Sequence, residues 1–115
     1  MSWKITYYKK NSGKIPVLDY IESQEPELVA KIRNALRLLK EFGIAESQLD
    51  TRKIKGKKYK GLHELKIDSS RIFYFLSTEK KFVLIHGFTK KSNKTPNREL
   101  ENALRRMKDY RGGLK

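Results

Sequence analysis

The first half of the chain carries one alternating segment followed by two segments with helical spacing. Apolar and polar positions alternate over residues 3–8, a pattern that predicts a short strand. Residues 15–23 are predicted to form a short helix that opens with Pro16 at a first-turn position. A longer helix follows Pro26, because apolar residues then recur at helical spacing until Gly43 provides a stop.

The second half of the chain is predicted to be mostly strand. After a loop at 44–50, apolar segments bounded by turn residues predict up to four strands. These strands span about 51–55, 59–67, 71–77 and 81–89. A last amphipathic helix starts near Pro96, with Thr95 as its N-cap. The resulting order, β-α-α-β-β-β-β-α, predicts an α+β fold with helices packed on an antiparallel or mixed sheet of four to five strands.

The residues at 68–69 suit the tip of a tight hairpin and predict the register of the two strands that it joins. Symmetric closure of that turn places Lys66 opposite Arg71, and Glu64 opposite Phe73. Opposed residues in an antiparallel pair share a face of the sheet. Lys66 and Arg71 are therefore expected to lie side by side on one face.

A second symmetric closure at 78–79 places Arg71 opposite His86. Lys66, Arg71 and His86 then form one basic row across three strands, with Phe88 two positions further along the same face. That face is predicted to continue with Phe73, Phe75, Phe82 and Leu84. The opposite face is predicted to be largely aliphatic and to be the seat of the helices. It collects Leu65, Ile67, Ile72, Tyr74, Leu76, Val83 and Ile85.

Composition adds a strong electrostatic imbalance to this fold. The chain has 115 residues, a formal net charge of +14 and a pI of about 10.0, and is expected to form one domain over residues 1–115. Such a charge favours polyanionic partners: nucleic acid, an anionic membrane surface or an acidic protein. The absence of cysteine excludes a disulfide framework and a thiolate zinc site. With no long apolar stretch and no signal-like segment, we expect a cytoplasmic, unanchored protein.

The stretch GFTKKSNKTP, at 87–96, is the clearest candidate for a site that binds an anion. An apolar strand ends there in three lysines, and the predicted helix N-terminus that follows also favours anions. Single loop lysines are usually just solvated, so the argument depends on their combination with the basic row. Structural alternatives remain for that row, since Arg71 can pair with Glu64 or Asp68, and His86 can be a packing residue.

Several motifs resemble the RelE/HigB toxin superfamily of type II toxin–antitoxin systems, in its phage-derived HigB-like branch. They are GLHELK at 61–66, RIFY at 71–74, FTKK at 88–91 and KTP at 94–96. The resemblance spans essentially the whole chain, and the last motif is its most specific part. Lys66 is a departure, because arginine is usual there. Lysine keeps the charge but loses the planar fork that binds phosphate through two hydrogen bonds.

The resemblance implies a ribosome-dependent mRNA endonuclease, in which the ribose 2′-OH attacks the adjacent phosphate. We expect neither metal nor cofactor, and the two histidines share no predicted face with a carboxylate triad. Lys66 and Arg71 are suited to stabilise the charge of the transition state, and Lys90 or Lys91 to hold a phosphate. The candidate proton carrier is either a lysine crowded by other cations or His86.

Other residues are predicted to bind RNA around this catalytic set. They are Lys53, Lys55, Lys57, Lys58, Lys60, Phe88 and Lys94. Phe88 is the candidate platform for stacking a nucleotide base.

The resemblance also implies two partners, mRNA on the ribosome and a cognate antitoxin. The antitoxin is expected to carry a helix-turn-helix domain, and operator DNA is expected to be reached only through it. No membrane partner is expected. Two rival functions stay open. A ParE-like gyrase inhibitor shares the fold and the antitoxin partner but lacks the basic row, and a non-enzymatic module would bind RNA without cutting it.

Overall fold

The order of helices and strands matches the sequence prediction. The structure is a computed structural model and describes residues 3–46, 48–77 and 80–112. Its elements are β1 (Lys4–Tyr7), α1 (Pro16–Glu22), α2 (Pro26–Phe42), η1 (Gly43–Ala45), β2 (Asp50–Lys53), η2 (Lys57–Tyr59), β3 (His63–Ile67), β4 (Ser70–Ser77), β5 (Lys81–Thr89) and α3 (Asn97–Gly112). The order β-α-α-β-β-β-β-α is therefore confirmed. The main differences are two single-turn 3-10 helices, η1 over Gly43 and the start of the predicted loop at 44–50, and η2 before the third predicted strand, which begins at His63 instead of residue 59.

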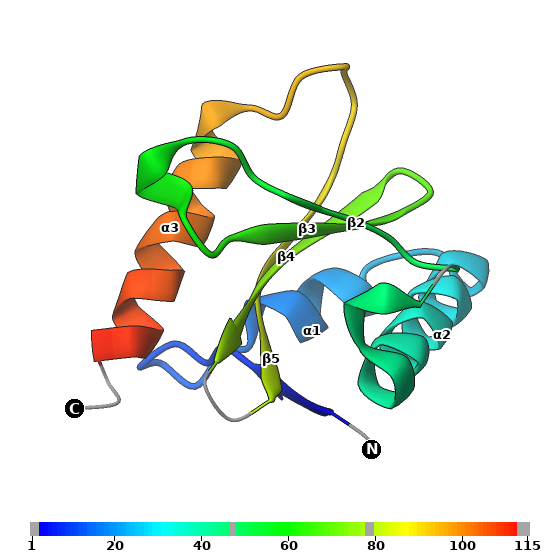
Figure 1. Cartoon of the computed structure of the whole chain (residues 1–115). Coiled ribbons are helices and arrows are strands. Elements are labelled where there is room, and N and C mark those ends of the chain that lie inside the picture. Colours follow the sequence, from blue (N-terminus) through cyan, green and yellow to red (C-terminus); the bar gives the residue numbers. More distant parts are fainter. Residues whose placement is uncertain (1–2, 47, 78–79, 113–115) are drawn as a thin grey trace.

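The strands form one five-stranded mixed sheet in the order β1-β5-β4-β3-β2. β1 runs parallel to β5, and the other neighbours are antiparallel. This confirms the predicted fold class. In Figure 1, α1 and α2 lie on one side of the sheet and α3 lies on the other. The prediction that all helices share one face is therefore wrong.

Each helical layer has its own apolar core against the sheet. On the α1/α2 side, α2 buries Ile32, Leu36 and Leu39 at helical spacing, and Gly43 ends the helix with a positive φ of 77°. A side chain at Gly43 would be strained, because its Cβ would lie 2.8 Å from Trp3 Nε1. On the other side, α3 packs through Ala103, Leu104 and Met107, as its spacing predicts.

The register of β3 and β4 is the predicted one. Lys66 lies opposite Arg71, and Glu64 lies opposite Phe73. The turn has Asp68 at a positive φ of 51°, a conformation that the short polar side chain of aspartate tolerates. The prediction succeeds here because the turn is tight and its residues are local in sequence.

The register of β4 and β5 differs from the prediction, and the basic row of Lys66, Arg71 and His86 is wrong. Ser77 pairs with Lys81, one residue away from a symmetric closure at 78–79. A β-bulge between the pairs of Phe73 and Tyr74 then shifts the register by a further residue. As a result, Arg71 lies opposite Phe88, and Phe73 lies opposite His86. Thr78 and Glu79 themselves lie outside the described residues.

The same shift moves four apolar residues of β5 to the faces opposite those predicted. Phe82 and Leu84 join the α1/α2 core, and Val83 and Ile85 join the α3 core. A slip of one residue exchanges the two faces of a strand, which is why one misplaced turn changes all four positions.

The connection into α3 also differs in its cap. The helix begins at Asn97, and the Pro96 carbonyl accepts from Glu99 N at 3.0 Å, so Thr95 lies one residue before the cap position. Thr95 Oγ1 is buried and has no hydrogen-bond partner among the described residues. Thr95 is therefore not the N-cap. Within the same residues, no helix combines the length and apolar character needed to cross a membrane.

Candidate functional site

A cleft of about 290 Å³ lies between the β2 edge of the sheet and the loop that precedes α3. We call it the basic cleft. Its lining includes Arg52, Lys55, Lys90, Lys94, Thr95 and Leu100. No carboxylate belongs to the part of the lining that the structure describes. Four like charges around one depression repel each other in the free protein, so the basic cleft is suited to a polyanion that neutralises them.

Arg52 is held in the basic cleft by a buried carboxylate. Its Nε donates to Glu64 Oε1 at 2.8 Å, and the two residues are opposite each other on β2 and β3. The Glu64 side chain is only 3% exposed, whereas that of Arg52 is 57% exposed. Glu64 Oε2 is buried without a hydrogen-bond partner among the described residues. The pair therefore presents a cation to solvent and keeps a half-satisfied carboxylate behind it.

Arg71 lies in the middle of the sheet and is 7% exposed. Its Nη1 donates to the backbone oxygens of Asp68, at 2.7 Å, and Ser70, at 3.0 Å. Its Nε is buried without a partner among the described residues. The Asp68 carboxylate instead pairs with Lys31 at 3.0 Å. Neither of the carboxylate pairings considered for Arg71 is formed, and the guanidinium is fixed by backbone carbonyls next to the exposed Lys66.

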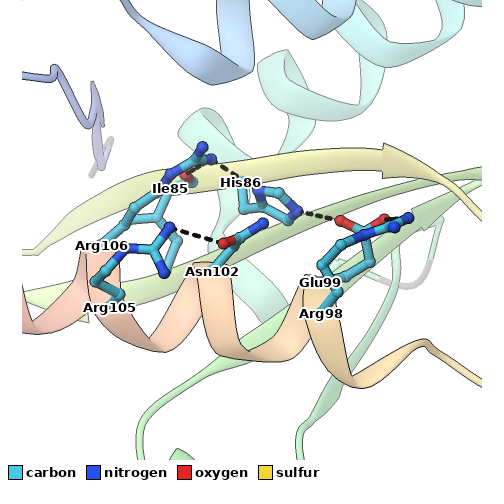
Figure 2. Close-up of polar contacts among 7 residues, drawn as sticks. All are labelled: Ile85, His86, Arg98, Glu99, Asn102, Arg105 and Arg106. Carbon is cyan, nitrogen blue, oxygen red and sulfur yellow. Dashed lines mark hydrogen bonds and ion pairs between the residues drawn. The ribbon is translucent and has the colours of Figure 1, made fainter.

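His86 is buried between β5 and α3 and is 7% exposed. Figure 2 shows its ring between Glu99 and Arg106, with 2.7 Å from Nε2 to Glu99 Oε1 and 2.7 Å from Nδ1 to Arg106 Nη1. Because arginine only donates, Nδ1 accepts, and the ring proton on Nε2 is donated to Glu99. Burial lowers the pKa of His86, with the Glu99 hydrogen bond acting in the opposite direction. The imidazole thus connects β5 to α3 as a neutral group.

The lysines of the 90–96 loop lie on two sides of it. Lys90 N donates to Ser69 O at 2.8 Å, and the side chains of Lys90 and Lys94 line the basic cleft. Lys91 lines a second pocket, of about 480 Å³, together with Tyr20, Phe88, Arg98 and Glu99. The three loop lysines are therefore not one cluster, because the loop itself separates Lys91 from the basic cleft.

Phe88 is more deeply packed than a free stacking platform would be. It is 6% exposed, and its ring centroid lies 5.3 Å from that of Phe73 and 5.8 Å from that of His86. Its stacking on a nucleotide base stays a prediction.

Of the predicted RNA-binding lysines at 53–60, Lys55 lines the basic cleft, whereas Lys53 pairs with His63 on the opposite face from Arg52. All five are exposed. Lys58 Nζ pairs with Glu101 at 2.8 Å, and Tyr59 OH donates to the same carboxylate at 2.7 Å, so this segment is attached to α3.

Two residues of the site were missed as functional candidates by the sequence analysis. Arg52 was not singled out, and Glu64 was considered only as a structural partner of Arg71. The available signal was the alternation of polar residues along the strand predicted at 51–55. No tight turn joins this strand to β3, so the sequence does not fix the register that places Arg52 opposite Glu64.

Solved structures similar to this chain share one fold. A chain of the archaeal RelE–RelB complex from Pyrococcus horikoshii matches with a TM-score of 0.59 and 12% identity, over 78% of this chain and 97% of that one. The YoeB dimer from Staphylococcus aureus matches with a TM-score of 0.55 and 17% identity, over 80% of this chain and 99% of that one. A chain of the RelB–RelE complex from Methanococcus jannaschii matches with a TM-score of 0.53 and 12% identity, over 63% of this chain and 81% of that one. The fold is therefore that of the RelE and YoeB toxins.

Sequence comparison gives the family. The profile of the phage-derived Gp49-like proteins matches residues 19–108, and the chain belongs to that family. A comparison with curated proteins finds no match. The resemblance to the RelE superfamily, in a phage-derived branch, is confirmed by the family and the fold together.

Proposed function

We propose that this protein is the toxin of a type II toxin–antitoxin system and that it cleaves mRNA on the ribosome. The observation that carries the proposal is the basic cleft, which four cations line and whose Arg52 lies on the same sheet face as Arg71. Membership of the Gp49-like family and the RelE-like fold support the same class of protein. A single RNA strand carries regularly spaced phosphates, and their negative charge would neutralise the cations of the basic cleft.

In the proposed reaction, the 2′-oxygen of one nucleotide attacks the adjacent phosphorus and expels the 5′-oxygen of the next. Arg71 is fixed by two backbone carbonyls, so its charge is preorganised and needs little reorganisation during the reaction. Together with Lys66 on the neighbouring strand, it stabilises the extra negative charge on the phosphoryl oxygens. Lys90 and Lys94 hold the phosphates on either side in the basic cleft.

The proposed partners are mRNA on the ribosome and an antitoxin that neutralises the toxin. Two of the matching structures are complexes of RelE with RelB, and another is a complex of YoeB with YefM. For this chain, the net charge of +14 favours an antitoxin that is acidic where it contacts the toxin. Operator DNA is reached through the antitoxin alone.

The test is cleavage of a defined mRNA on purified ribosomes, followed by primer extension. Wild-type protein should cut the message, and Arg71→Ala should cut it at least about a hundredfold more slowly, the usual cost of losing a preorganised charge. Lys90→Ala should also be slower. Arg37→Ala, an exposed arginine of α2, is the matched control and should cut normally.

Two further measurements separate the rivals. Because Arg71 is buried, thermal unfolding must show that Arg71→Ala is folded, and ribosome binding must be retained. An RNA-binding module would bind ribosomes without cutting, and a gyrase poison would inhibit supercoiling and leave the mRNA intact. Wild-type cleavage by both Arg71→Ala and Lys90→Ala would place the reaction elsewhere.

A further inference from the structure

One carboxylate oxygen next to the basic cleft has no partner. Glu64 Oε1 accepts from Arg52, but Glu64 Oε2 is buried and accepts no hydrogen bond from any described residue. A buried acceptor without a hydrogen bond destabilises the fold, so such an atom in a folded protein calls for a functional explanation. A water molecule or a substrate hydroxyl group is the kind of donor that would satisfy it.

The neighbouring residue on the same face has the complementary vacancy. Arg71 Nε is also buried without a partner, and Arg71 lies one row from Glu64, since Lys66 pairs with Arg71 and Glu64 with Phe73. The two atoms are an acceptor and a donor, yet no hydrogen bond joins them. An RNA backbone offers both complements, a 2′-OH that donates and a phosphoryl oxygen that accepts.

Other acidic groups of the β3–β4 turn and of α3 are already engaged. Asp68 pairs with Lys31, Glu99 accepts from His86, and Glu101 binds Lys58 and Tyr59. His86 uses both of its ring nitrogens. Glu64 therefore offers a buried acceptor with a vacant site, held on the internal strand β3 rather than on a loop.

We propose that Glu64 is the general base of the proposed RNA cleavage, which takes the proton of the attacking 2′-OH. This inference rests on the proposed function and adds a catalytic residue to it. Arg52 covers the carboxylate through one hydrogen bond and is 57% exposed, so a phosphate in the basic cleft competes for it. When Arg52 turns to that phosphate, the carboxylate becomes accessible to the ribose beside Arg71.

The step balances without a metal or a redox partner. The 2′-O–H bond breaks and its proton moves to Glu64, while the 2′-oxygen forms a bond to phosphorus. The bond from phosphorus to the 5′-oxygen breaks, and that oxygen takes a proton from the Lys90 ammonium group. The products are a 2′,3′-cyclic phosphate and a 5′-hydroxyl. Glu64 then gives its proton to solvent, and Lys90 regains one.

The test compares single-turnover cleavage at saturating ribosomes by wild type, Glu64→Gln and Arg52→Gln, on an mRNA whose cut was mapped with wild type. Glu64→Gln keeps an acceptor for Arg52 but cannot take the proton, so the rate should fall by about a hundredfold or more. Ribosome affinity should change by less than about threefold. Arg52→Gln should mainly weaken binding. Glu22→Gln, the same substitution at an exposed glutamate of α1, should cut normally.

A substrate with sulfur in place of the leaving 5′-oxygen identifies which proton transfer is lost. Such a leaving group needs no acid, so Lys90→Ala should recover on this substrate and Glu64→Gln should not. Three outcomes would overturn the assignment. They are recovery of Glu64→Gln on the sulfur substrate, a Glu64→Gln rate within about threefold of wild type on the normal mRNA, and a rate loss in Arg52→Gln equal to that in Glu64→Gln. If Glu64→Gln does not fold, the rate of Glu64→Asp is measured instead. Aspartate is one methylene shorter and moves the carboxylate away from the ribose, so full activity in this variant would contradict a positioned base. Failure of wild type to cut would refute the proposed function itself.

Discussion

The two faces of the sheet are built in different ways. The α1/α2 face is apolar over its centre, with Leu65, Ile67, Ile72, Tyr74 and Leu84 all buried. The α3 face is apolar only at one end, around Phe73, Phe75 and Val83, and carries Arg52, Glu64, Arg71 and His86 toward the other. In Figure 1, α3 stands toward one end of its face, and the loop before it extends over the other end. The basic cleft lies where the second layer is incomplete.

The difference extends to hydrogen bonding. Four buried side-chain atoms in the described chain have no partner: Glu64 Oε2, Arg71 Nε, Ser77 Oγ and Thr95 Oγ1. The first three residues belong to the α3 face by strand alternation, and Thr95 lines the basic cleft. A face that only stabilised the fold would satisfy these groups or replace them with apolar ones. The α1/α2 face therefore stabilises the fold. The polar end of the α3 face lowers the stability of the fold and retains polar groups that serve the proposed reaction.

The largest effect that sharpens this comparison is expected in the α1/α2 core. Phe82 is 1% exposed, and its ring lies 5.1 Å from Trp3 and 5.7 Å from Tyr74, centroid to centroid. Phe82→Ala should lower the free energy of unfolding by about 3–5 kcal/mol, measured by urea denaturation. Lys55→Ala and Lys94→Ala, two exposed lysines of the basic cleft, should each change it by less than about 0.5 kcal/mol. A loss of several kcal/mol in either lysine variant would contradict the division of roles.

A smaller effect is expected from the buried histidine of the α3 face. The pKa of His86 is lowered in the folded state, so the unfolded state takes up its proton first as the pH falls. The stabilising contribution is present above the unfolded pKa of about 6.5 and is lost progressively below it, by at most about 1.4 kcal/mol per pH unit. Urea denaturation at pH 7.5 and pH 5.5 should therefore show a larger loss for wild type than for His86→Gln.

The matched control for that measurement is the other histidine. Burial also lowers the pKa of His63, with a further contribution from Lys53, so the comparison should be repeated in a His63→Gln background. Equal losses with and without His86 in that background would show that burial between β5 and α3 does not keep the ring neutral.

The smallest effect concerns salt. If the exposed lysines around the basic cleft contact RNA phosphates, the affinity for single-stranded RNA should fall with ionic strength. Lys55→Gln and Lys60→Gln should each reduce the slope of log affinity against log salt by about 0.7. Lys9→Gln and Lys10→Gln, in the connection from β1 to α1, remove the same charge and should leave the slope unchanged. A wild-type slope near zero would remove the electrostatic basis of the site.

Most of the fold was predictable because its signals are local. Helix periodicity, Pro16, Pro26 and Gly43 define α1 and α2, and the turn at 68–69 fixes β3 against β4. The family motifs, carried by the same segments, also indicated the RelE-like class. The adjacency of Lys66 and Arg71 followed from this one hairpin.

Only the tertiary structure decided how the β5 strand and α3 meet the site. The pairing of Ser77 with Lys81 and the bulge between the pairs of Phe73 and Tyr74 together move His86 away from Arg71, and α3 then supplies the Glu99 and Arg106 that enclose it. A bulge has no fixed sequence signal, and contacts between segments far apart in the chain depend on which face each helix covers. The pairing of Arg52 with Glu64 has the same origin, since β2 reaches β3 across a connection with no tight turn to set its register. The sequence by itself determined the elements, their order and one hairpin, whereas packing determined which charged groups face one another.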